Sequence, residues 1–222
     1  MDAEHSWQVI EQQRLAIANL LDGLSAEQWE APSLCAGWRV RDVAAHVSLV
    51  GLPPTPGELL VQGIKVRGSF HRLNTAMSVR RAARPTAQLI ADLRQHAGSR
   101  KIPAVSNWQN VLFDVLVHGQ DIAIPLRLDL SMPADAAGEG ATRVWTMGWP
   151  FWAKRRLHGL QLTATDLHWT VGAGADVHGP IRALLLLLTG RATTAAPLLS
   201  GPGTSLITNT TTPSERQRPR SR

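Results

Sequence analysis

The most informative pattern of apolar and polar positions lies between Val105 and Pro125, a stretch with one glycine and no proline before its end. At roughly 100° per residue, five of its polar side chains fall on one strip of a helix. Most of the remaining circumference is apolar, so the pattern predicts a largely buried helix whose polar strip needs partners or water. The strip consists of Asn107, Asn110, Asp114, His118 and Asp121.

Two interpretations of this strip are open. It could be the solvated face of a core helix, although such faces carry Lys, Arg and Glu, whereas this one carries short carboxylates, amides and an imidazole. Alternatively, Asp114 and His118 stand four residues apart, close enough on a helix to bind one ion. Because Asp-x-x-x-His also arises by chance, a metal site would need a third ligand from elsewhere in the chain.

Apolar periodicity predicts four main helices with short connections over residues 1–130, an up-and-down bundle. A capping box at Ser25 and Gln28 predicts a short turn before the second main helix. His46 lies at the edge of the apolar stripe of that helix, where a histidine is commonly just half-buried. The helical ranges are 7–21, 38–50, 55–81 and 105–125, with a shorter piece at 86–96.

After Pro125 the pattern changes, and residues 131–208 read as a small α+β domain. An alanine-rich helix is predicted at 133–147, and a strongly apolar helix at 181–188. Between them the alternation has period two, which predicts strands that include 160–164 and 169–171, with turns at 165–166 and 172–174. The expected fold class is therefore α+β, mainly α. Residues 209–222 are polar, proline-broken and arginine-rich, and are expected to be disordered.

Composition excludes several classes of partner. The net charge is +6, but four arginines against Glu215 supply +3 of it in the last eight residues, which does not argue for a nucleic-acid surface. Cys35 is the only cysteine, so no internal disulfide can form and a reducing compartment is expected. The first thirty residues lack the pattern of a signal peptide, and the apolar run Ala183–Leu188 is too short for a bilayer. We expect a cytoplasmic protein without nucleic-acid or membrane partners.

Three sets of motifs in the chain point to one resemblance. The first set is Trp29-x-x-Pro32-Ser33-x-Cys35-x-Gly37-Trp38-x-Val40-x-Asp42-Val43-x-x-His46-Val47. The second is Val117–Ala123, and the third lies in residues 159–191. The first two resemble the opening motif and the second histidine motif of the mycothiol-dependent maleylpyruvate isomerase family, and the third resembles its small C-terminal domain. This family is part of the wider DinB-like superfamily of metal-dependent four-helix bundles.

The resemblance implies a divalent metal ion, typically zinc, held by His46, Asp114 and His118. The family pattern has glutamate where this chain has Asp114, whose side chain is one methylene shorter. The resemblance also implies mycothiol as thiol cosubstrate and a small electrophilic substrate. Three protein ligands leave a coordination position open, where a thiol would become a nucleophile. The expected activity is isomerisation or thiol transfer; a non-enzymatic regulatory module that binds a metal or ligand is the alternative.

Other residues receive simpler expectations. Asp121 could orient His118 or be a solvated carboxylate near the helix end. Arg191 could reach an anionic substrate, although capping the preceding helix is the expected role. Cys35 and the tryptophans Trp29 and Trp38 are expected to pack. The histidines without ligand-type spacing are His5, His71, His96, His158, His168 and His178.

Overall fold

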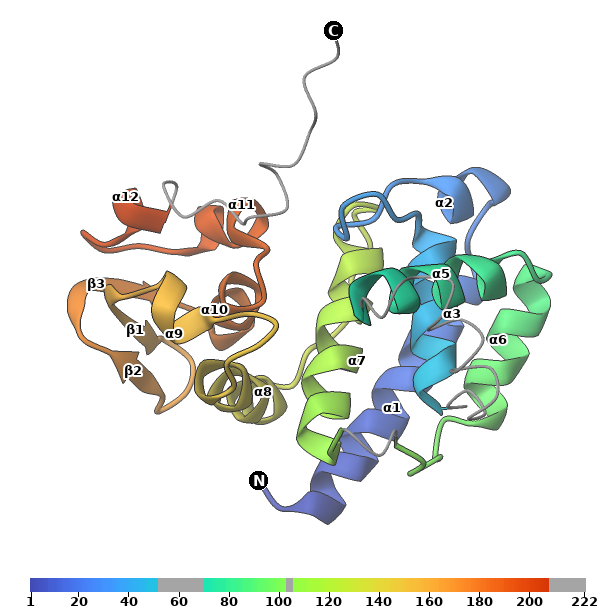
Figure 1. Ribbon diagram of the computed structural model, residues 1–222, viewed down its shortest axis with the longest axis horizontal. Coiled ribbons are helices and arrows are strands. Elements are labelled where there is room, and N and C mark those ends of the chain that lie inside the picture. The colour runs from blue at the N-terminus through green and yellow to red at the C-terminus, as the bar shows by residue number, and fades with distance from the viewer. Residues whose placement is uncertain (52–69, 103–105, 208–222) are drawn as a thin grey trace, which may run out of the picture. The chain divides into compact units, whose positions relative to one another are not determined.

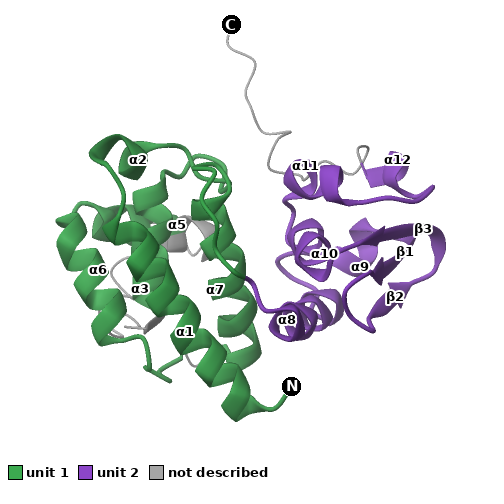
Figure 2. Cartoon of the chain, turned by 180° about the vertical axis from the view of Figure 1, so that it is seen from behind, with its two compact units in different colours: residues 1–131 green, residues 132–222 purple. Residues whose placement is uncertain are grey.

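A computed structural model of the chain describes residues 1–51, 70–102 and 106–207 (Figure 1). The chain divides into two compact units, Met1–Ser131 and Met132–Arg222, which Figure 2 shows in different colours. The first is helical, and the second combines helices with a three-stranded sheet. The predicted fold class, α+β and mainly α, is confirmed.

Unit 1 is a helix bundle. α1 packs against α6 and α7, and α3 packs against α5, α6 and α7. The bundle core is formed by fully buried side chains such as Ile10, Leu89 and Leu116. The helices are α1 (Ala3–Asp22), α2 (Ala26–Glu30), α3 (Val40–Gly51), α5 (Phe70–Ala82), α6 (Thr86–Gln95) and α7 (Trp108–Ala123).

α6 and α5 correspond to two of the expected helical ranges, 86–96 and 55–81. α6, expected only as a shorter piece, packs against both α1 and α3 and is a full member of the bundle. Of the helix expected at 55–81, the described part is α5; residues 52–69 lie outside the described residues.

Side-chain caps explain where several helices begin. The predicted capping box at Ser25 is present, with Gln28 as its partner. α7 begins at Trp108, because the side chain of Asn107 accepts a hydrogen bond from the backbone N–H of Asn110 at 2.9 Å. Asn107 is therefore a cap rather than part of the helical strip.

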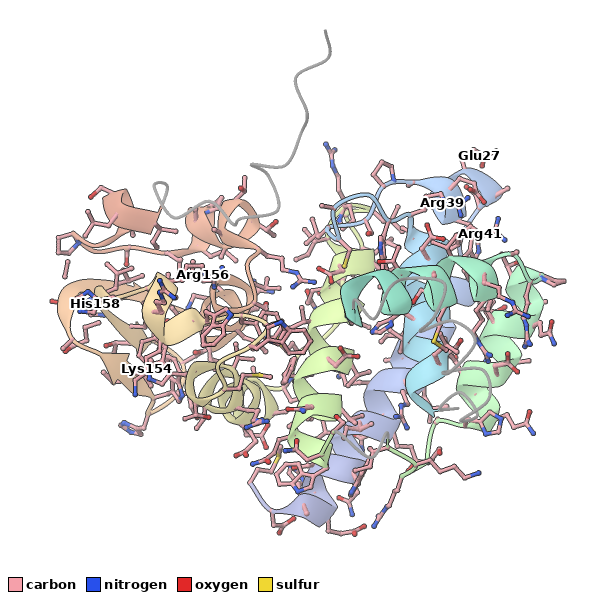
Figure 3. All side chains as sticks on the ribbon, in the orientation of Figure 1. Glu27, Arg39, Arg41, Lys154, Arg156 and His158 are labelled. Carbon is pink, nitrogen blue, oxygen red and sulfur yellow. The ribbon has the colours of Figure 1, made fainter. Side chains whose placement is uncertain are left out.

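Ion pairs anchor the first turn of α3. The Arg39 guanidinium donates to the Asp42 carboxylate at 2.9 Å and to Glu30 of α2 at 2.7 Å. Burial opposes ionisation of Asp42, but the hydrogen bonds from Arg39 outweigh it and lower the pKa of that carboxyl. Arg39 and Arg41 both lie beside α2 (Figure 3), and Arg41 also pairs with Glu30. These contacts fix the start of the helix that carries His46.

Unit 2 contains a sheet of order β2-β1-β3, in which β1 pairs antiparallel with β2 and parallel with β3. α10 packs against α8 and against β1. The elements are α8 (Ala134–Thr146), α9 (Ala153–Arg156), β1 (Gly159–Ala164), β2 (Thr170–Gly172), β3 (Gly174–Gly179), α10 (Ile181–Leu188), α11 (Ala192–Ala195), the 3-10 helix η1 (Ala196–Leu198) and α12 (Thr204–Ile207).

The strand β3 was not predicted, and its first residue lies in an expected turn. Gly174 has φ 130°, and a side chain there would collide with the carbonyl oxygen of Gly159 in β1. Only glycine permits this close approach, so the strand begins with a residue that is typical of turns and not of strands. Val177 is its buried apolar residue, paired in register with Leu162.

Two arginines cap the C-terminal end of α10. The Arg191 guanidinium donates to the carbonyl of Thr189 at 2.7 Å. Arg156, labelled in Figure 3, donates to the carbonyls of Leu187 and Leu188 at 3.1 and 2.8 Å. Arg191 therefore has the capping contact expected of it, because the last carbonyls of a helix lack partners within the helix.

The tail predicted to be disordered, 209–222, lies outside the described residues. Within the described ranges, no helix combines the length and the apolar character needed to cross a membrane.

Candidate metal centre

α7 carries Asp114, His118 and Asp121 on successive turns. The exposed fraction of the side chain falls along this series, from 25% at Asp114 through 15% at His118 to 0% at Asp121. A solvated face would not bury a carboxylate completely. The interpretation of these three residues as a solvated face is therefore wrong.

His46 of α3 joins Asp114 and His118. Its Nε2 lies 3.5 Å from Asp114 Oδ2, and Nε2 of His118 lies 3.4 Å from Asp114 Oδ1. The two imidazole ring centroids are 4.8 Å apart, with the rings at 79° to each other. The structure thus brings together the three residues expected as ligands, with one potential ligand atom from each lying within 4.8 Å of the others.

The spacing of these atoms fits a small divalent ion. A tetrahedral ion with ligands at about 2.0–2.1 Å separates them by roughly 3.3–3.4 Å, and the observed nitrogen-to-oxygen separations are 3.4 and 3.5 Å. The two imidazoles approach different oxygens of Asp114, so the shorter side chain is long enough to reach both. Two imidazoles and one carboxylate form a donor set that suits zinc and related ions.

Each histidine has a partner at its other ring nitrogen. Asp121 Oδ2 lies 2.8 Å from Nδ1 of His118; since an ionised carboxylate only accepts, Nδ1–H donates and Nε2 remains for the cluster. Ser78 Oγ, fully buried on α5, lies 3.4 Å from Nδ1 of His46. Asp121 is thus placed to orient His118, and its interpretation as a solvated carboxylate is wrong.

The two expected packing tryptophans differ in their surroundings. Trp29 is buried in the core, with 5% of its surface exposed. Trp38 is only half-buried, and its ring meets His46 edge-on at a centroid distance of 5.6 Å. Trp38 therefore forms part of the wall around the cluster.

Charge coupling makes the cluster retain a proton. Burial opposes the charge of both Asp114 and His118, but the positive charges of His118 and His46 hold the pKa of Asp114 well below its ordinary value. Burial alone would lower the pKa of His118, but the negative charge of Asp114 outweighs it and raises this pKa well above its ordinary value. Hydrogen bonds, including the one to Asp121, add to the increase. Without an ion, His118 and Asp114 form an ion pair at neutral pH. A bound cation would have to displace that proton.

Cys35 also reaches this region, which sequence reasoning missed. Its Sγ lies 3.1 Å from Asp121 Oδ2 and 3.7 Å from His118 Nδ1. Cys35, His118 and Asp121 form a second group of potential ligand atoms that shares His118 with the first. No spacing rule links a loop residue to a helix 86 positions later, so the sequence contained no signal for this contact.

Arg14 is a second residue that the pattern did not single out. It lies on α1 with 1% of its surface exposed, and its Nη1 donates to the carbonyls of Ala97 and Ser99 at 2.8 Å each. Burial lowers the pKa of the guanidinium, and the charge of Asp114 opposes this lowering. Arg14 therefore lies within electrostatic reach of the cluster.

The remaining histidines with described side chains belong to neither group of potential ligands. They are His5, His96, His158, His168 and His178; the side chain of His71 lies outside the description.

A comparison with protein families identifies the domain that contains His46. Residues 10–105 match the family model described as the mycothiol maleylpyruvate isomerase N-terminal domain. The chain carries the N-terminal domain of the mycothiol maleylpyruvate isomerase family. The match ends just before α7, so Asp114 and His118 follow the matched region.

Two solved structures share the fold across both units. One, the crystal structure of the mycothiol-dependent maleylpyruvate isomerase, has 14% identity and a TM-score of 0.63. The other, a histidine-to-alanine mutant of the mycothiol-dependent maleylpyruvate isomerase, has 12% identity and a TM-score of 0.58. Each comparison covers 92% of this chain and 94% of the other chain. A comparison with curated protein sequences gives no match.

Proposed function

We propose that this chain is a divalent-metal-dependent enzyme of the mycothiol-dependent isomerase or thiol-transferase type, acting on a small electrophilic substrate. The observation that carries the proposal is the cluster of His46, Asp114 and His118, with donor atoms spaced for one ion. The family match of the preceding helices and the fold shared with a mycothiol-dependent isomerase support the choice of thiol. Zinc is the ion we propose, and the single cysteine supports a reducing cytoplasm.

The residues of the cluster would hold the ion and leave room for a thiol. His46, Asp114 and His118 supply three ligands, so a four-coordinate ion keeps one position open. When bound, the ion would stabilise a thiol there as a thiolate at neutral pH. Asp121 keeps Nε2 of His118 directed at the cluster.

The reaction class follows from the chemistry of such a thiolate. It can add to an electrophilic double bond, and rotation followed by loss of the thiol isomerises the substrate. Attack at another electrophilic centre instead transfers the thiol. In both cases His46, Asp114 and His118 would hold the ion, and the half-buried Trp38 beside His46 would form part of the wall of the site.

Metal analysis and cobalt spectroscopy test the proposal. Purified protein should hold about one divalent ion per chain. In the cobalt-substituted protein, added mycothiol should produce a sulfur-to-cobalt charge-transfer band. His118→Ala should lose both the ion and the band. His96→Ala is the matched control, since His96 belongs to neither group of potential ligands.

Two results would count against the proposal in different ways. Full metal occupancy in His118→Ala would refute the ligand assignment. If cobalt binds but neither mycothiol nor any other thiol changes the spectrum, the thiol-dependent activity is refuted. A non-enzymatic module that binds a metal or ligand would then be the function that the cluster supports.

A further inference from the structure

Cys35 lies beside the cluster without a role in the proposed function. We propose that Cys35 is a positioning residue: its thiol donates a hydrogen bond to Asp121 and thereby fixes the carboxylate that orients His118. The inference rests on the proposed function only in taking His118 as a ligand. The hydrogen bonds that carry it involve Nδ1 of His118 and not Nε2, the nitrogen that faces the cluster.

The thiol and the imidazole meet at the same oxygen atom. Oδ2 of Asp121 lies 2.8 Å from His118 Nδ1 and 3.1 Å from Cys35 Sγ. Asp121 is fully buried, so water cannot replace a donor that is lost. A thiol is a weak donor to neutral acceptors, but an ionised acceptor strengthens the bond. Removing the thiol would therefore leave the carboxylate less firmly oriented.

The backbone around Cys35 holds the thiol in place. The N–H of Leu34 donates to the carbonyl of Asp121 at 3.1 Å, which ties the loop to the end of α7. Within the loop, the N–H of Cys35 donates to Ser33 Oγ at 3.1 Å, and the N–H of Trp38 donates to the carbonyl of Cys35 at 2.9 Å. Because this loop leads directly into α3, the thiol connects the two helices that carry the ligands.

The positions of the two ring nitrogens argue against Cys35 as a ligand of the same ion. The thiol lies on the Nδ1 side of His118, at 3.7 Å. Asp114 and His46 meet in the cluster on the other side, where Nε2 of His118 lies 3.4 Å from Asp114 Oδ1. The lone-pair directions of the two nitrogens diverge, so an ion at Nε2 lies away from the sulfur while Nδ1 keeps its bond to Asp121.

Substitutions at position 35 test the inference with two measurements. The first is ¹⁵N NMR of the metal-free protein, which reports the solvent exchange of the His118 Nδ1 proton. The second is cobalt affinity, measured by competition with a chelator. Cys35→Ala should accelerate the exchange and weaken cobalt binding by about 10-fold, the low end for residues that orient ligands. Cys35→Ser should restore both, because a hydroxyl also donates.

Two controls separate this role from a general effect on the loop. Ala36→Ser alters the exposed neighbour of Cys35 and should change neither measurement. In an Asp121→Ala background, which has no carboxylate to orient, Cys35→Ala should cause no further loss of cobalt affinity. A full additional loss in that background would show that Cys35 acts independently of Asp121.

Unchanged exchange and unchanged affinity in Cys35→Ala would overturn the inference. So would a sulfur-to-cobalt band that is present without added thiol and lost in Cys35→Ser, because Cys35 would then be a ligand. If wild-type protein binds no cobalt, the proposed function fails, and the NMR measurement on the metal-free protein still decides the role of Cys35.

Discussion

Competition between a proton and a metal ion at His118 gives the sharpest quantitative prediction. We compare the apparent metal affinity at pH values from about 5.5 to about 7.5, with the protein folded throughout. His118 Nε2 lies 3.4 Å from Asp114 Oδ1. At an effective dielectric constant of about 20, that separation gives an attraction of about 5 kcal/mol between unit charges, partly offset by burial. The raised pKa of His118 means that an entering cation must displace its proton.

One displaced proton sets the size of the effect. Apparent metal affinity should rise about tenfold per pH unit, or about 100-fold over the range.

The stability of the metal-free protein should change in the opposite direction. The pKa of His118 is raised in the folded protein, so protonated His118 stabilises the fold. This stabilisation is complete below the ordinary pKa of about 6.5 and is lost as the pH rises through the raised pKa. The difference in melting temperature between loaded and metal-free protein should therefore widen as pH rises.

Calorimetry in two buffers of different ionisation enthalpy counts the released protons, and chelator competition gives the affinity. Asp114→Asn is the control, since it removes the charge that raises the pKa of His118 and should flatten the pH slope. A wild-type affinity that does not change with pH would refute the reasoning. The same holds for an unchanged slope in Asp114→Asn.

Three further predictions concern single substitutions. Asp114→Glu should retain more metal after dialysis than Asp114→Asn, because an amide oxygen is a poorer ligand than a carboxylate. Leu116→Ala, fully buried in α7, should cost about 2–5 kcal/mol in urea unfolding; Val79→Ala, at a 44% exposed position, should cost less than about 0.5 kcal/mol. Gly174→Ala should destabilise the chain by at least about 1–3 kcal/mol, since φ is 130°, and an unchanged melting temperature would contradict this.

The sequence predicted those features that depend on local periodicity. The apolar stripe of α7 fixed the direction of Asp114 and His118, because residues four apart share one face. His46 was different: its position at a stripe edge allowed an ordinary half-buried histidine, and only the family resemblance joined it to α7. Burial then decided between the two interpretations of Asp121, which spacing alone had left equal.

Features that depend on tertiary contact were missed. The contact between Cys35 and Asp121 joins a loop to a helix end through a turn whose geometry no periodicity encodes. Arg14 is buried on the inner face of α1, and the carbonyls that accept from its guanidinium come from the segment that follows α6. In unit 2, the start of β3 was hidden because its close contact with β1 requires a glycine at position 174, and glycine there is typical of a turn.

The location of the cluster within unit 1 has an evolutionary consequence. Its three members, His46, Asp114 and His118, come from the unit that ends at Ser131, and so do Cys35 and Asp121. A gene fusion or recombination event at that boundary would pass on the whole set of proposed ligands intact. The downstream domain can then be exchanged or altered without loss of the residues proposed to bind the ion.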